Sequence, residues 1–174
     1  HLRNRLGVGL VLLLLTSASH SITATAPKVL VLGDSLSAAY GMNMEQGWVH
    51  LLAQKLKARA SQSNVVNASI SGDTTGGGAR RLPALLKEHE PTLVIIELGG
   101  NDGLRAYPIK QMRTHLTEMT RASKNANAKV LLLAAEAPPN LGRRYTTMFR
   151  DSYAEVAQQG DVAVLPFIVE HIFL

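Results

Sequence analysis

The chain has 174 residues, a length that suits one domain with a short extra segment and excludes two full domains. Its composition is 46% hydrophobic and 18% charged but only 5% aromatic, which predicts a largely aliphatic core, and the absence of cysteine excludes disulfides, thiolate zinc sites and cysteine nucleophiles. The formal charge of +5 is small and no basic stripe is interleaved with aromatic residues, so we expect no nucleic-acid partner.

Residues 1–26 have the pattern of a secretory signal peptide. Arg3 and Arg5 form a basic start, Leu6–Leu15 form an apolar run, and small polar residues follow. This run is shorter than the ~20 residues that span a bilayer, although a membrane anchor or a buried helix is an alternative interpretation. We therefore expect export to the periplasm or out of the cell. The mature domain would cover residues 27–174 and would have no stable membrane span, and the cleavage position stays open.

Short apolar runs alternate with amphipathic segments from Pro27 onward. Runs typical of buried parallel strands cover residues 28–32, 64–68, 93–98, 129–134 and 161–165. Helical spacing of apolar residues predicts helices over residues 48–59, 79–89, 111–123 and 146–159. The glycine-rich stretch 72–78 and the run 99–102 are interpreted as loops. This alternation predicts an α/β domain with a five-stranded parallel sheet and helices on both faces.

Three of the predicted strands are followed by loops with unusual polar residues. Ser35 follows the first strand, Gly72 the second and Asn101 the third. Because the carboxyl ends of parallel strands meet at one edge of a sheet, we expect the three residues to converge there. A serine hydroxyl with nearby N–H donors is the combination that attack on a carbonyl group requires.

Each of these signals has an ordinary structural explanation when it stands alone. A serine after a strand is more often a helix cap, and glycine and asparagine are common turn residues. The stretch 72–78 also suggests a phosphate loop, but neither Gly-Lys-Ser/Thr nor the Gly-x-Gly-x-x-Gly spacing is present. The order and placement of Ser35, Gly72 and Asn101 after three separate strands favour the catalytic interpretation.

The motifs GDSL at 33–36, SGDTT at 71–75 and GGND at 99–102 resemble the first three conserved blocks of the SGNH (GDSL) hydrolases. The surrounding sequence is similar to the thioesterase I/lysophospholipase branch of that family. The resemblance implies a three-layer flavodoxin-like fold, an acyl ester, thioester or lysophospholipid substrate, no cofactor or metal, and a monomer. It makes Ser35 the nucleophile, and its own N–H, the Gly72 N–H and the Asn101 side chain the oxyanion donors.

The sequence departs from that family in its last block, an Asp-x-x-His segment that supplies the general base. No Asp-x-x-His occurs in the chain, so we expect a domain truncated at its C-terminus, without the final helix and with little activity of its own. His171 is a poor substitute, and His50, His89 and His115 are expected on solvated helix faces. The alternative is a non-catalytic acyl- or lipid-binding protein that has lost its base.

Overall fold

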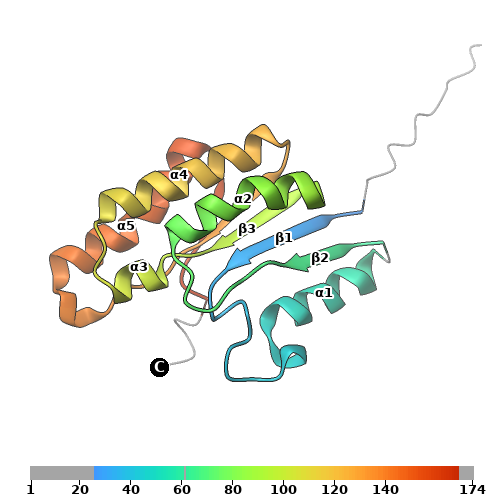
Figure 1. The fold of residues 1–174 in the computed structure, drawn as a ribbon, viewed down its shortest axis with the longest axis horizontal. Coiled ribbons are helices and arrows are strands. Elements are labelled where there is room, and N and C mark those ends of the chain that lie inside the picture. The colour runs from blue at the N-terminus through green and yellow to red at the C-terminus, as the bar shows by residue number, and fades with distance from the viewer. Residues whose placement is uncertain (1–25, 61, 169–174) are drawn as a thin grey trace, which may run out of the picture.

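A parallel sheet of five strands runs through the middle of the computed structural model, which describes residues 26–60 and 62–168 (Figure 1). The strands are β1 (Lys28–Gly33), β2 (Asn64–Asn67), β3 (Leu93–Glu97), β4 (Lys129–Leu133) and β5 (Ala163–Leu165). Their order in the sheet is β2-β1-β3-β4-β5, and every neighbouring pair is parallel. The predicted five-stranded parallel sheet is thus confirmed. Three predictions lie outside the described residues, namely those of the leader, of the missing final helix and of the role of His171.

Helices cover both faces of this sheet. They are α1 (Trp48–Arg59), α2 (Thr75–His89), α3 (Gly100–Leu104), α4 (Ile109–Asn125) and α5 (Arg143–Gly160), with short 3-10 turns η1 (Met44–Gln46) and η2 (Pro139–Leu141). The long helices α2, α4 and α5 lie on one face and α1 lies on the other, which gives the predicted three layers (Figure 1).

The alternation of side chains along β1 divides the core between the two faces. Leu30 and Leu32 point into the larger cluster under α2, α4 and α5, whereas Val29 and Val31 pack with Val49 of α1. All four strand residues are almost completely buried. Both faces of β1 are therefore apolar, which is why its sequence is a continuous hydrophobic run.

The face that α1 covers is left partly open beside the last two strands. A groove of about 560 Å³ lies there, lined mainly by apolar side chains such as Trp48, Leu133, Leu165 and Ile168. Leu165 is 49% exposed and Ile168 is 36% exposed.

The glycine-rich stretch 72–78 was interpreted as a loop, but α2 already begins at Thr75, and this part of the prediction is wrong. Thr74 caps the helix, because its hydroxyl accepts a hydrogen bond from the Gly77 N–H. A Cβ atom at Gly78 would lie 2.2 Å from the Leu98 side chain. Glycine therefore serves close packing of the helix on the core here, and the low helix propensity of glycine misled the prediction.

The run 99–102 also differs from its prediction as a loop, since Gly100–Leu104 form the short helix α3. The other helices match their predicted positions within a few residues. Among the described residues, no helix has the length and apolar character needed to cross a membrane.

Candidate active site

The turn that follows β1 presents Ser35 at the carboxyl edge of the sheet. The Asp34 carboxylate accepts the Leu36 N–H at 3.1 Å, a local turn of the kind that aspartate often forms. Asp34 is buried, while Ser35 itself is partly accessible. Ser35 is thus held by its neighbours, and its hydroxyl makes no hydrogen bond to any residue within 26–60 and 62–168.

Asn101 lies in the first turn of α3, next to the Ser35 turn. Its side-chain amide donates a hydrogen bond to Asp34 Oδ2 at 3.1 Å. This bond fixes which side of the amide carries the N–H groups, and the second N–H remains available for another acceptor. The GGND motif at 99–102 therefore lies next to the GDSL motif at 33–36.

Gly72 occupies the turn between β2 and α2 with a φ of 80°, a left-handed conformation that glycine adopts without strain. Arg105 joins this turn to α3, because its guanidinium donates to the Gly72 carbonyl at 3.3 Å and to the Asn101 carbonyl at 3.2 Å. The backbone N–H groups of Gly72 and Ser35 donate to no acceptor in the described part of the chain. Unpaired N–H groups are suitable donors for an oxyanion that develops within their reach.

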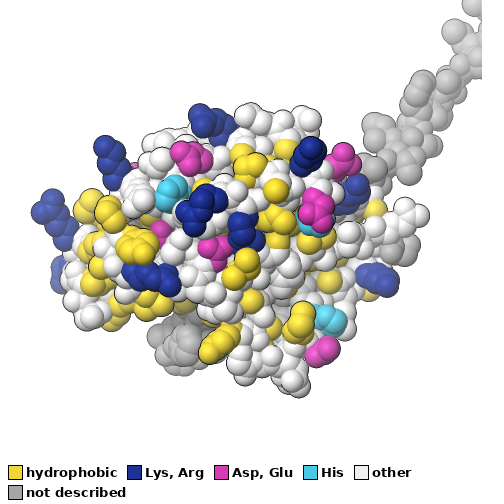
Figure 2. All heavy atoms as spheres, viewed as in Figure 1, with side chains coloured by type: hydrophobic (Ala, Val, Ile, Leu, Met, Phe, Trp, Pro, Cys, Tyr) yellow, Lys and Arg dark blue, Asp and Glu magenta, His cyan; other side chains and the backbone are white. Residues whose placement is uncertain are grey.

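Ser35 and Asn101 line one cavity of about 340 Å³. Its walls also include apolar side chains, namely Leu104 of α3, Ala135 and Pro138 after β4, and Phe167 after β5. Gly72 is not among its lining residues. Figure 2 shows apolar side chains gathered over α3 and the start of α5, a region where Leu104, Tyr107 and Met148 are exposed.

Glu97, the last residue of β3, lies beneath the Ser35 turn and was not singled out from the sequence. Its Oε2 atom accepts the Ser37 hydroxyl at 2.8 Å and faces the Asp34 N–H at 3.4 Å. Burial, together with the charge of Asp34, raises the pKa of Glu97 to about 7, and burial also raises the pKa of Asp34. A charged residue at the end of an otherwise apolar strand run was the available signal in the sequence.

Asp102, the neighbour of Asn101, is part of the GGND motif, but no role was predicted for it. It is buried and accepts two hydrogen bonds from Thr75, the first residue of α2. His115 Nδ1 lies 3.1 Å from the same Thr75 hydroxyl. His115 is thus half-buried and partnered rather than on a solvated face as predicted. Its position three residues after Met112 and four before Met119, both buried in α4, was the signal that could have placed it.

The general base is not found among the described histidines. His50 pairs with Gln54, His89 lies beside Glu88, and His115 contacts Thr75. None of these three is hydrogen-bonded to Ser35 within the residues that the structure describes. In that same part of the chain, no group of three or more His, Asp, Glu or Cys side chains is arranged to hold a metal ion.

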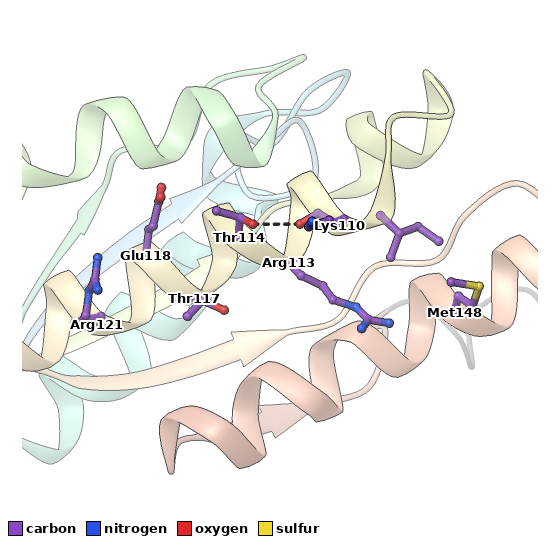
Figure 3. Close-up of a pocket in the computed structure, with 8 residues that line it drawn as sticks. Lys110, Arg113, Thr114, Thr117, Glu118, Arg121 and Met148 are labelled. Carbon is purple, nitrogen blue, oxygen red and sulfur yellow. Dashed lines mark hydrogen bonds between the residues drawn. The ribbon is translucent and has the colours of Figure 1, made fainter.

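A second groove of about 460 Å³ lies on α4 and the start of α5 (Figure 3). Arg113 extends from α4 toward α5, where it donates to Ser152 and pairs with Glu155. The groove contains none of the three predicted site residues, so the cavity at the edge of the sheet is the better candidate for catalysis.

Comparison with known proteins decides the family. Residues 31–174 match the GDSL-like Lipase/Acylhydrolase family. The chain belongs to this family. The arylesterase of Vibrio mimicus is 45% identical over 165 residues, covering 95% of this chain and 81% of the relative. Thioesterase 1/protease 1/lysophospholipase L1 of Escherichia coli (strain K12) is 47% identical over 151 residues, covering 87% of this chain and 71% of the relative.

A solved esterase structure has the same architecture. The esterase EstA from Pseudoalteromonas sp., inhibited by monoethylphosphonate, superposes with a TM-score of 0.80 at 47% sequence identity. The match covers 84% of this chain and 80% of that chain. The expected SGNH fold is confirmed, and the protein is an ester hydrolase of the GDSL-like family.

Proposed function

We propose that the chain hydrolyses carboxylic esters and thioesters through an acyl intermediate on Ser35. The observation that carries this proposal is the meeting of Ser35 and Asn101 in one cavity at the carboxyl edge of the sheet. The unpaired N–H groups of Ser35 and Gly72 support it, since they add donors of the kind that a developing oxyanion needs.

In the proposed reaction, Ser35 Oγ attacks the carbonyl carbon of the substrate and gives up its proton to a general base. The negative charge that forms on the carbonyl oxygen is stabilised by the Asn101 amide and the two backbone N–H groups. Collapse of this intermediate breaks the bond to the alcohol or thiol, which leaves with the proton. Water then attacks the acyl-Ser35 ester, and the carboxylic acid and the serine hydroxyl are released.

We place the base of this scheme outside the described residues, because within them none of His50, His89 and His115 is hydrogen-bonded to Ser35. A positioned histidine, oriented by a carboxylate, is the group that serine hydrolysis ordinarily uses. Such a base contributes about 10²–10⁴ in rate, so it determines much of the activity.

The proposed substrates carry an apolar acyl or aryl group. Leu36, Leu104 and Phe167 line the cavity together with the reacting serine and would contact such a group. Aryl esters, acyl thioesters and lysophospholipids fit this description, and the names of the Vibrio and Escherichia relatives refer to the same classes.

Hydrolysis of a chromogenic aryl ester by the Ser35→Ala variant tests the proposal. Turnover should be abolished, because alanine lacks the attacking oxygen. Ser63→Ala is the matched control, since Ser63 precedes β2 at the opposite end of the strands and its hydroxyl has no hydrogen-bond partner in the described chain. Unchanged turnover in Ser35→Ala would remove Ser35 from the mechanism.

We also propose that residues 1–26 direct export, on the basis of their basic start and apolar run. Expression with and without these residues, followed by cell fractionation, tests this. The longer form should be found outside the cytoplasm and the shorter form inside it. Recovery of both forms in the cytoplasm would contradict the proposal.

A further inference from the structure

Two carboxyl groups lie together under the Ser35 turn, those of Asp34 and Glu97. Asp34 is only 3% exposed and Glu97 only 2%. Glu97 is paired with Gly33 in the sheet, so it lies beside the residue that leads into the turn. Glu97 Oε2 faces the Asp34 N–H at 3.4 Å, so the two carboxyl groups share one buried site. Two ionised carboxylates in one buried site repel each other, which favours the protonated form of one of them.

The hydrogen bonds around the pair identify the protonated member. Asp34 accepts N–H groups from Leu36 and from the Asn101 side chain, and such donors favour the ionised form. Glu97 accepts the Ser37 hydroxyl and faces a single, longer contact from the Asp34 N–H. This pattern favours Glu97 as the protonated member and Asp34 as the ionised one. The pKa of Glu97, raised to about 7 by burial and by the charge of Asp34, agrees with this assignment.

We propose that Glu97 is a positioning residue, which as a neutral acid donates a hydrogen bond to Asp34. In this way it fixes the position of the Ser35 turn relative to the Asn101 amide. The inference rests on the proposed roles of Ser35 and Asn101. Asp34 connects the two, because it directly precedes Ser35 and also accepts the Asn101 amide. Ser37, two residues after Ser35, adds a second attachment of the same turn to Glu97.

The other titratable groups near the pair are acids or a phenol. Asp73 acts on Asp34 through its charge, and Tyr153 of α5 lies close enough to be influenced by Asp34, Glu97 and Asp102. Glu136 lines the same cavity and pairs with Arg150. Among residues 26–60 and 62–168, no lysine or arginine forms an ion pair with Asp34 or Glu97. Arg105, at the end of α3, donates to the Gly72 and Asn101 carbonyls instead.

Loss of the proton from Glu97 should therefore loosen the site. Above about pH 7 the second carboxylate ionises beside Asp34, and the hydrogen bond between them is replaced by repulsion. The Ser35 turn and the Asn101 amide then lose their common attachment. A small displacement of reacting groups costs about 10² in rate, so kcat should fall as Glu97 ionises, whereas KM should change little.

Two substitutions separate this role from simple packing. Glu97→Gln keeps an amide N–H that can donate to Asp34 and an oxygen that can accept from Ser37, but it cannot ionise. Glu97→Leu fills a similar volume and makes neither bond. We expect Glu97→Leu to lose about 10² in kcat, whereas Glu97→Gln should retain most of kcat at pH 6 and no longer decline above about pH 7. Glu88→Gln is the control, because Glu88 is an exposed glutamate at the end of α2.

A spectroscopic measurement tests the proton independently of turnover. Infrared spectra of the protein at pH 6 should contain the C=O stretch of a buried protonated carboxyl group, and this band should disappear as the pH rises through about 7. The band should be absent from Glu97→Gln and present in Glu88→Gln.

Absence of the band from the native protein, or equal damage by Gln and Leu at position 97, would overturn the proposal. Full activity of Ser35→Ala would instead refute the proposed function. The infrared result does not depend on turnover, so the two failures can be distinguished. If Glu97→Leu fails to fold, the pH profile of Glu97→Gln and the infrared band still decide the question.

Discussion

Asp102 and Thr75 are joined by two hydrogen bonds that connect α3 to the first residue of α2. Asp102 Oδ2 accepts the Thr75 N–H at 2.9 Å, and Oδ1 accepts the Thr75 hydroxyl at 2.6 Å. Both residues are buried, with 3% and 0% of their surface exposed. Asn101 directly precedes Asp102, and Gly72 lies three residues before Thr75. The pair therefore fixes the segments that carry two of the proposed oxyanion donors relative to each other.

Asp102→Asn should damage this connection with little change in volume. The asparagine oxygen can accept the Thr75 N–H, but its amide N–H groups then face the Thr75 hydroxyl, which must accept instead of donate. Hydrogen bonds to charged groups contribute about 1.5–3 kcal/mol and neutral ones about 0.5–1.5 kcal/mol, so the free energy of unfolding should fall by about 1 kcal/mol. We expect kcat to fall as well, measured on an aryl ester beside urea denaturation, with the exposed Asp151→Asn as control. Loss of stability at unchanged kcat would restrict Asp102 to a structural role.

Asn101→Ala should lower kcat by about 10²–10³, the usual cost of removing one oxyanion donor. KM should change little, because the interaction is strongest in the transition state. Steady-state kinetics on an aryl ester measure both constants. Asn125→Ala, at the exposed end of α4, provides the comparison. An equal effect of the two substitutions would argue against a direct role for Asn101.

Gly78→Ala should destabilise the fold although alanine favours helices. The added methyl group would lie 2.2 Å from Leu98 Cδ1 and 3.2 Å from Met119 Sδ, so either α2 or these buried side chains must shift. Overpacking of this kind costs about 1–3 kcal/mol in the free energy of unfolding, which urea denaturation measures. Gln158→Ala on the exposed face of α5 should change it by less than about 0.5 kcal/mol. A stabilised Gly78→Ala variant would mean that the contact is looser than described.

Stability should decline with rising pH because of Glu97. Burial and the charge of Asp34 raise its pKa from 4.5 to about 7. Between these values the folded state binds more protons than the unfolded state, so the free energy of unfolding falls as the pH rises through this window. The full change is on the order of 3 kcal/mol, since one pKa unit corresponds to about 1.4 kcal/mol. Glu97→Gln should lack this component in urea titrations at several pH values. An identical pH dependence in the variant would assign the decline to other groups.

The sequence predicted the sheet well because its central strands, such as β1 and β3, are buried on both faces. A run such as residues 28–32 has no polar face, and such runs between amphipathic segments are diagnostic of parallel strands. The early start of α2 could not be predicted, since glycine has a low helix propensity. Tertiary packing overrides this low propensity, because the helix lies so close to Leu98 that a Cβ atom at Gly78 would overlap the Leu98 side chain.

The site was predicted in part. Ser35 and Asn101 follow different strands, and the rule that strand ends converge placed them in one cavity. The residues beneath them were missed, because Glu97 reads as the end of a strand and Thr75 as part of a glycine-rich loop. Their roles arise from partners distant in the sequence, Ser37 for Glu97 and Asp102 for Thr75, and local patterns contain no information about such pairs.

Covalent labelling of Ser35 tests the central claim most directly. The protein is treated with an activated aryl phosphonate ester, which reacts with a nucleophilic serine, and is then digested and examined by mass spectrometry. The predicted result is a single phosphonyl group on the peptide that contains Ser35, absent from Ser35→Ala and retained in Ser63→Ala. A phosphonyl group on another residue, or equal labelling of Ser35→Ala, would contradict the assignment of Ser35 as the nucleophile.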